Sequence, residues 1–486
     1  MDPLQAVTTH GTETALDDAS LQEFAERLRG PLIHPDHEAY DEARALYNGM
    51  IDKHPCLIAR CANVADVMAG VRFADEHNLL LAVRGGGHNG PGHALCDGGL
   101  VVDLSQMRGV RVDPEARTVQ VEGGATWGDV DHATHAFGLA TVSGVISTTG
   151  VGGLTLGGGH GYLSRKYGLT IDNLRSADVV LADGSFVVAS ETQNEDLFWA
   201  LRGGGGNFGV VTSFTFQLHP VDTVIAGPML WPVDELGPTL RWYREWLPRA
   251  PEDVYAFYQI ARVPPVPIFP DAIHGEKACG LMWCCTGPEP RAKEVIQEAR
   301  EVADPLAEHI GPVPYPALQR MFDPLLPAGL QWYWKGDFVR ELSDEAIAVH
   351  ERFADVPTPL STMHLYPIDG AVHEVGEHET AWSYRDARWS MVIGGIDPDP
   401  ANRETITSWA RNYWEAIHPH TAGGAYLNFM MEEGNDRIKA TYRDNYARLR
   451  RVKARYDPDN LFRVNQNIAP ARGAAGQRWR SCSCSV

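Results

Sequence analysis

Three glycine-rich stretches constrain the fold more than any other feature of this sequence. They are RGGGHNGPGH (84–93), TTGVGGLTLGGGHGYLSRKYGL (148–169) and RGGGGNFGVV (202–211). Glycine lets the backbone come close to a ligand and exposes its N–H groups, which suits a diphosphate. Each stretch adjoins a predicted strand, so together they indicate one large ligand lying across several loops.

The common nucleotide-binding motifs are absent from the sequence. No G-x-x-x-x-G-K-[ST] pattern occurs, which excludes a P-loop. No G-x-G-x-x-G lies between an early strand and helix with an acidic residue about 20 positions later, so a Rossmann dinucleotide site is unsupported. The glycine loops must therefore form a ligand site of another kind.

Charge and composition exclude several classes of partner. The chain has 486 residues, with 42 Lys plus Arg against 63 Asp plus Glu and a formal charge of −21. Such a surface disfavours nucleic acid and anionic membranes. We see no secretory signal and no apolar run near the roughly 20 residues of a membrane span. The eight cysteines lack metal-type spacing, so we expect reduced thiols in a cytoplasmic protein of unknown oligomeric state.

The residue composition and the pattern of predicted elements change twice along the chain. Residues 1–220 begin with a mostly helical stretch of 50 residues and then alternate strands, helices and glycine loops. Residues 221–420 are rich in Pro and aromatic residues and predict an antiparallel sheet with helices on one face. Residues 421–470 predict one strand and then a helix closed by YDPDN, and residues 471–486 predict a disordered tail. The fold class is therefore α+β with two domains.

Four motifs together resemble a known flavoprotein family. They are RGGGH (84–88), GGATWGDV (123–130), GVGGLTLGGGHGYLSRKYGLTIDNL (150–174) and DLFWALRGGGGNFGVVTSF (196–214). They look like the FAD domain of vanillyl-alcohol-oxidase-type flavoproteins, and most closely like the berberine-bridge-enzyme-like oxidases. The resemblance implies a two-lobed FAD domain, with 221–420 as the substrate domain and 421–470 returning to the FAD domain.

The resemblance gives His88 a specific role. In this family the corresponding histidine bonds covalently to the 8α-methyl carbon of the flavin. A neutral imidazole is a nucleophile, and the preceding glycines let it reach the ring edge. Some members carry a second link from a cysteine, but the aligned residue here is Ile146 and no cysteine is near. We therefore predict FAD attached through His88 alone.

The resemblance also implies a set of FAD contacts around His88. The predicted cofactor-binding residues are Arg84, Gly85, Gly86, Gly87, His88, Asn89, Gly90, Thr148, Thr149, Gly150, Val151, Gly152, Gly153, Leu154, Gly158, Gly159, Tyr162, Gly209, Val210, Tyr426, Asn428, Asn465 and Gln466.

One departure from the family puts the catalytic base in doubt. Many relatives have Y-x-N-Y, with the final Tyr as base, whereas this chain has Tyr426-Leu-Asn428-Phe429. Phenylalanine cannot accept a proton. The candidates to replace it as a catalytic residue are Tyr426, His160, Tyr366, His364 and Glu432.

Two further clusters admit more than one interpretation. HEVGEHE (373–379) could suggest a metal site, but its two histidines are five residues apart and fall on different faces of a helix, so we expect a charged surface loop and no metal. The aromatic residues Trp332, Tyr333, Trp334, Trp382 and Tyr384 fit either a substrate pocket or packing within a sheet.

Together these features predict an FAD-dependent oxidase. Hydride would pass from a small alcohol, sugar or secondary-metabolite substrate to flavin N5, and O2 would reoxidise the flavin and give H2O2. A small residue at Gly144, in the region that resembles the family's oxygen gate, favours an oxidase. The alternatives are a dehydrogenase that passes electrons to a carrier or quinone, a flavin-carrying binding protein without turnover, and a nucleotide- or sugar-binding module without flavin.

Overall fold

A parallel sheet leads into the first glycine stretch. The computed structural model describes residues 4–471. Strands β4, β6 and β5 are parallel, and β3 pairs antiparallel with β4. The elements of this region are β1 (Leu4–Val7), β2 (Glu13–Leu16), α1 (Asp18–Arg27), β3 (Leu32–Ile33), α2 (Tyr40–Arg44), β4 (Leu57–Arg60), α3 (Val64–Glu76), β5 (Leu81–Arg84) and β6 (Leu100–Asp103). The glycine stretch 84–93 thus begins at the carboxyl end of β5.

The prediction that the first 50 residues are mostly helical was wrong. They include the antiparallel hairpin of β1 and β2 and the short strand β3, besides α1 and α2. Ala6 and Leu16 are buried in this hairpin while the preceding residues, Gln5 and Ala15, are exposed, which is the alternation of a strand.

A five-stranded antiparallel sheet carries the other two glycine stretches. Its order is β11-β10-β12-β8-β7. The elements of this region are β7 (Val110–Asp113), β8 (Thr118–Glu122), α4 (Trp127–His135), β9 (Leu139–Ala140), α5 (Val151–Leu156), α6 (Ser164–Tyr167), β10 (Leu174–Val180), β11 (Phe186–Ser190), α7 (Glu195–Leu201), β12 (Val210–Gln217) and β13 (His219–Pro220). Of these, β9 and β13 pair with each other in a separate two-stranded sheet. The predicted hairpin at Asp183-Gly184 joins β10 and β11, with Gly184 at φ +71°.

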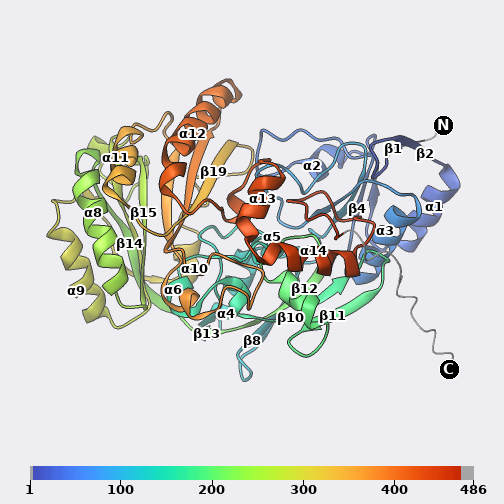
Figure 1. The fold of residues 1–486 in the computed structure, drawn as a ribbon, viewed down its shortest axis with the longest axis horizontal. Coiled ribbons are helices and arrows are strands. Elements are labelled where there is room, and N and C mark those ends of the chain that lie inside the picture. Colours follow the sequence, from blue (N-terminus) through green and yellow to red (C-terminus); the bar gives the residue numbers. More distant parts are fainter. Residues whose placement is uncertain (1–3, 472–486) are drawn as a thin grey trace.

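An eight-stranded antiparallel sheet forms the other half of the molecule (Figure 1). Its path is β17-β14-β16-β15-β20-β21-β19, and β18 also pairs with β14. The elements are β14 (Thr223–Pro232), α8 (Leu236–Trp246), β15 (Val254–Arg262), β16 (Lys277–Cys285), α9 (Glu289–Arg300), β17 (Ala307–Glu308), β18 (Gly311–Pro314), α10 (Tyr315–Gln319), β19 (Gln331–Val339), α11 (Asp344–Arg352), β20 (Thr362–Pro367), β21 (Trp389–Asp397) and α12 (Arg403–Ile417).

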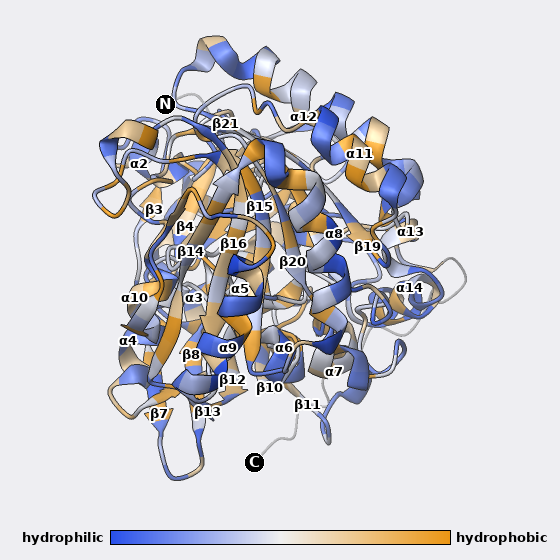
Figure 2. Cartoon of the chain, turned by 90° about the vertical axis from the view of Figure 1, so that its left-hand side faces the viewer, coloured by the Kyte–Doolittle hydropathy of each residue, from blue (hydrophilic) through white to orange (hydrophobic). Residues whose placement is uncertain are grey.

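Helices cover one face of this sheet, as predicted from the sequence. Helix α12 buries Ile406, Ala410, Tyr413 and Ile417, whose helical spacing makes one apolar stripe. Figure 2 shows the helix layer in front of the largely hydrophobic strands β14, β15 and β16. Because side chains alternate along a strand, the residues of β20 and β21 that do not face this layer point toward the glycine loops.

The C-terminal segment packs against the five-stranded sheet. Figure 1 shows α13 (Asn435–Tyr442) and α14 (Asn445–Tyr456), in red, on the side of the molecule that carries α5 and β12. The buried Lys453 of α14 donates to the carbonyl oxygen of Asn207 at 2.7 Å and pairs with Asp457 at 2.6 Å. This ion pair anchors the segment beside the third glycine stretch.

The strand predicted around Tyr426 was wrong. The structure has a single 3-10 turn there, η8 (Leu427–Phe429), in which the N–H of Phe429 donates to the carbonyl oxygen of Tyr426 at 2.8 Å. The turn forms where no neighbouring strand pairs with this segment. The tail predicted to be disordered, with Cys482 and Cys484, lies outside the described residues. Within those residues, no helix has the length and apolarity that a bilayer crossing requires.

Candidate active site

A cavity of about 360 Å³ lies between the glycine loops and the eight-stranded sheet. We call its loop side the glycine wall, formed by Gly85, Gly86, Gly87, Thr149, Gly150, Gly152, Gly153, Leu154, Gly205, Gly206, Gly209 and Val210. We call the opposite side the sheet wall, formed by Trp332 and Trp334 of β19, Thr362, His364 and Tyr366 of β20, and Val392, Gly394 and Ile396 of β21. All three glycine stretches thus meet at one cavity.

The glycine wall brings two backbones into contact and leaves a bare surface beside them. A Cβ on Gly86 would lie 2.5 Å from the Cα and N of Gly150, so neither loop tolerates a side chain there. At Gly153 and Gly206, in contrast, no protein atom lies within 4 Å of the Cβ position. The wall therefore offers open backbone on which a large cofactor can lie, as FAD requires.

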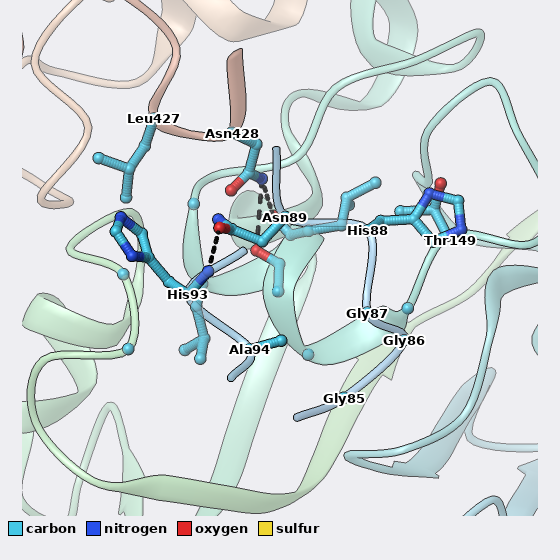
Figure 3. A pocket seen from close by; sticks show the side chains of 18 of the residues that line it. Gly85, Gly86, Gly87, His88, Asn89, His93, Ala94, Thr149, Leu427 and Asn428 are labelled. Atoms are coloured by element: carbon cyan, nitrogen blue, oxygen red, sulfur yellow. Dashed lines mark hydrogen bonds between the residues drawn. The ribbon is translucent and has the colours of Figure 1, made fainter. Parts of the chain in front are cut away.

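His88 lines this cavity as a neutral imidazole. Its ring stacks on Tyr47, with ring centroids 3.9 Å apart and planes inclined by 16°. Burial lowers the pKa of His88 from 6.5 to about 4, and a hydrogen bond with the Thr148 backbone opposes this shift only partly. Figure 3 shows the imidazole of His88 on one side of its loop and that of His93 on the other. The position and the unprotonated state of His88 both suit a nucleophile.

The C-terminal segment closes one end of the glycine wall. The Asn428 side chain donates to the carbonyl oxygens of Gly153 and Leu154, both at 3.3 Å (Figure 3), and to the Tyr426 hydroxyl at 2.7 Å. The Asn465 side chain donates to the carbonyl oxygen of Gly206 at 3.1 Å. The turn η8 and the end of the described chain thus fix the glycine loops from outside the first domain.

One buried side chain joins the two walls. The Asn48 amide nitrogen donates to the carbonyl oxygens of Gly90 at 2.8 Å and Trp332 at 3.0 Å, and its oxygen accepts from the Trp332 N–H at 3.1 Å. Gly90 belongs to the loop of His88, and Trp332 belongs to β19. A fully buried amide with these bonds fixes the distance between the loop and the sheet wall.

His160 projects unpartnered polar atoms among the rings at one end of the cavity. Both of its ring nitrogens are buried without a hydrogen-bond partner among the described residues. Its ring centroid lies 4.6 Å from that of Tyr426 and 5.4 Å from that of Tyr366. Burial lowers the pKa of His160 to about 3. Because an unpaired buried donor is costly, these nitrogens are placed to meet a ligand.

A hydrogen-bonded pair lies beside His160 on the sheet wall. His364 Nδ1 and the Tyr366 hydroxyl are 2.6 Å apart. Burial lowers the pKa of His364 to about 3 and raises the pKa of Tyr366 well above its usual value. Both groups are therefore neutral, and a single proton is shared between the nitrogen and the oxygen.

The cavity contains no charged side chain. Among residues 4–471, those that line it include no Asp, Glu, Lys or Arg. Its four histidines, His88, His93, His160 and His364, all have pKa values lowered to about 3 or 4 by burial. Ligands in this cavity are therefore recognised by backbone groups, neutral hydrogen-bonding groups and ring faces.

Most of the residues predicted from the sequence line the cavity. Exceptions among the predicted cofactor contacts are Arg84, Gly90, Thr148, Val151, Gly158, Gly159 and Tyr162. Arg84 donates to the carbonyl oxygen of Ala43, and the ring of Tyr162 packs edge-on against Tyr255. Among the base candidates, Tyr426, His160, Tyr366 and His364 meet at the cavity, whereas Glu432 is exposed and does not line it.

The two ambiguous clusters are now placed. Trp332 and Trp334 line the cavity, but Tyr333, Trp382 and Tyr384 do not. In the HEVGEHE stretch, His373 bonds to the carbonyl oxygen of Ala387 at 2.8 Å and His378 to the Asn445 side chain at 2.9 Å.

Sequence reasoning missed Tyr47, Asn48, His93 and Asn207. His93 and Asn207 lie within the first and third glycine stretches, which could have pointed to them, whereas Tyr47 and Asn48 belong to no recognisable motif.

Comparison with known proteins identifies the family. Residues 55–190 match an FAD binding domain, and residues 425–469 match the "Berberine and berberine like" family. The chain is 32% identical to an FAD-linked oxidoreductase of Dictyostelium discoideum over 454 residues, which cover 93% of this chain and 97% of that protein. This protein is a berberine-bridge-enzyme-like FAD-linked oxidoreductase.

Other members of the berberine-bridge-enzyme-like family are similar over the same length. The (R)-6-hydroxynicotine oxidase of Paenarthrobacter nicotinovorans is 30% identical over 461 residues, covering 91% of this chain and 97% of that protein. The crystal structure of 6-hydroxy-D-nicotine oxidase from Arthrobacter nicotinovorans superposes with a TM-score of 0.82 at 27% identity, covering 91% of this chain and 98% of that one. The predicted family and fold class are confirmed.

Proposed function

We propose that this FAD-linked oxidoreductase is an oxidase whose FAD is attached by one covalent bond to His88. When bound, FAD would supply the two-electron oxidation of a substrate carbon, with O2 as final acceptor and H2O2 as product. The observation that carries the proposal is the neutral, half-buried imidazole of His88 at the edge of a glycine-lined cavity. The oxidases among the relatives support it.

The two walls of the cavity would bind different ligands. The glycine wall would hold the cofactor against open backbone, with Asn428 and Asn465 fixing its loops. Tyr47 would orient the imidazole of His88 by stacking. The sheet wall would bind a small molecule beside His160, exclude water and accept its proton. Ile146 lines the cavity where some relatives carry a second linking cysteine, so a single bond is expected.

The attachment is tested with two histidine variants. Wild-type protein should be yellow, should stay yellow after acid precipitation, and should give a flavin-bearing peptide that contains His88. His88→Ala should release all of its flavin on precipitation. His93→Ala is the matched control, because His93 lines the same cavity with a similarly lowered pKa, and it should keep the bond. A colourless wild-type pellet would contradict the covalent bond.

The electron acceptor is tested separately. After anaerobic reduction by a substrate, admission of air should restore the flavin absorbance within seconds and produce one H2O2 for each substrate oxidised. Slow recovery in air combined with fast recovery by a quinone would instead identify a dehydrogenase.

A further inference from the structure

We propose that Tyr366 and His364 form the proton-accepting pair of this enzyme, and that its substrate is a neutral alcohol carried on a ring. The inference rests on the proposed function, because the substrate's electrons must go to the flavin. It names the residues that replace the missing tyrosine at Phe429, and it names the class of substrate.

The pair is built into the sheet wall by strand geometry. Residues 362, 364 and 366 alternate along β20, so their side chains share the face that lines the cavity. The Tyr366 ring is held between Phe257, at a centroid distance of 4.9 Å, and Phe429, at 5.8 Å. A hydroxyl that is fixed in this way and bonded to an imidazole at 2.6 Å is positioned for proton transfer.

Other groups at this end of the cavity are less suited to accept the proton. Phe429 has no acceptor atom. The Tyr426 hydroxyl already accepts a hydrogen bond from the Asn428 side chain at 2.7 Å, and no imidazole is hydrogen-bonded to it among the described residues. His160 has no second group to which it could pass a proton, since neither ring nitrogen has a partner among the described residues. It is placed to bind the substrate oxygen.

The step balances as a two-electron oxidation. The carbinol C–H bond would break, and its hydrogen would leave with the electron pair; FAD, when bound, would supply the oxidant for these two electrons. The O–H proton of the substrate passes to the Tyr366 oxygen while the tyrosine's own proton passes to His364 Nδ1. The carbon–oxygen single bond becomes a carbonyl, so the product is an aldehyde or ketone and His364 carries the proton released.

The lining of the cavity determines the class of alcohol. A buried charge without a counter-charge costs several kcal/mol, and no charged side chain among the described residues faces the cavity. A carboxylate or ammonium group on the substrate should therefore bind less well than a neutral group of the same size. Trp332 and Trp334, with ring centroids 5.5 Å apart, present aromatic surface from β19. Such a surface favours a flat ring over an open chain.

The substrate class is tested with compounds that differ only in charge. Benzyl alcohol and its ring-substituted neutral derivatives would be compared, under anaerobic conditions, with 4-carboxybenzyl alcohol and 4-(aminomethyl)benzyl alcohol. We expect neutral members to reduce the flavin at least 100-fold faster than the charged ones at equal concentration. Faster reduction by a charged member would overturn the substrate class.

The proton-accepting pair is tested with Tyr366→Phe and His364→Gln. Both should slow flavin reduction about 100-fold or more, the usual contribution of a general base. Tyr255→Phe is the matched control, because it removes a buried, unpartnered hydroxyl from the neighbouring cluster without touching the cavity, and it should change the rate less than 2-fold. Reduction by either pair variant at the wild-type rate would overturn the pair.

A binding measurement separates proton transfer from a structural role. The tertiary alcohol 2-phenyl-2-propanol has no carbinol hydrogen and can bind without being oxidised. Its binding, followed by tryptophan fluorescence, should weaken less than 3-fold in Tyr366→Phe, and the covalent flavin content should be unchanged. A parallel loss of binding and rate would instead assign Tyr366 to positioning. Wild-type protein that no compound reduces would contradict the proposed function itself.

Discussion

The two walls of the cavity recognise their ligands in opposite ways. The glycine wall uses backbone from three loops and carries few side chains, so it suits a large cofactor whose shape never changes. The sheet wall uses alternating side chains on β19, β20 and β21, and each can be replaced without disturbing the ladder of strands. The comparison teaches that one fold can keep its cofactor fixed while its substrate varies.

The largest effect is expected from a side chain added to the glycine wall. Gly86→Val would place atoms within about 2.5 Å of the Gly150 backbone, so the two loops would separate. We expect purified Gly86→Val to retain less than roughly a tenth of the wild-type flavin, as measured by absorbance. Gly311→Ala is the control, because no atom lies within 4 Å of its Cβ position, and it should keep full flavin content. A normal flavin content in Gly86→Val would show that the two loops can separate and still hold the cofactor.

A side chain removed from the sheet wall should weaken substrate binding. Trp334→Ala deletes apolar surface worth about 1.5–3 kcal/mol when buried, so the dissociation constant of a neutral ring alcohol should rise roughly 10-fold to 100-fold. Fluorescence titration of the remaining tryptophans or calorimetry would measure it. The contrast between the walls predicts that the flavin content stays normal in the same preparation. Loss of both substrate binding and flavin content in this variant would contradict the assignment of separate ligands to the two walls.

Burial of neutral histidines makes stability depend on pH. The folded chain favours unprotonated His160, whose pKa falls from 6.5 to about 3, whereas the unfolded chain takes up the proton below 6.5. Stability is therefore lost as pH falls from 6.5 toward 3. His160→Phe should lose about 2 kcal/mol less of its unfolding free energy than wild type between pH 7 and pH 5. Urea unfolding at the two pH values measures the difference.

A second buried histidine provides the control for this measurement. Burial also lowers the pKa of His350 to about 3, and its Nδ1 bonds to Tyr413 under the helix layer, away from the cavity. His350→Phe should flatten the pH dependence by a similar amount. An unchanged pH dependence in His160→Phe would show that the folded chain can protonate this site.

The smallest effect is expected at Glu432. This carboxylate matched the residue type of a general base, but it is exposed and does not line either wall. The rate of flavin reduction by substrate in Glu432→Ala should therefore lie within 2-fold of the wild-type rate. The anaerobic assay is the one applied to Tyr366→Phe. A large loss of rate would mean that the chain around η8 moves during turnover.

The glycine wall could be predicted from the sequence because its residues are contiguous. Three short stretches specify it. The sheets around it were indicated by the hairpin signal at Asp183-Gly184 and by the change in residue composition near residue 221. The sheet wall could not be predicted in the same way. Its residues lie on three strands whose register, such as His364 opposite Val392, is set by tertiary pairing. Tyr47 and Asn48 were missed because only the folded chain brings them to His88 and Gly90.

The buried amide of Asn48 limits how freely such enzymes can exchange parts. Three of its hydrogen bonds hold the loop of His88 and the start of β19 in one register. A chimera that receives residues 221–420 from a relative would inherit a foreign β19 but keep this amide. The loop of His88 would keep its position only where the donor's β19 offers the Asn48 side chain the same backbone N–H and carbonyl groups. Transplanting new substrate specificity into this scaffold thus depends on a buried residue that does not itself line the cavity.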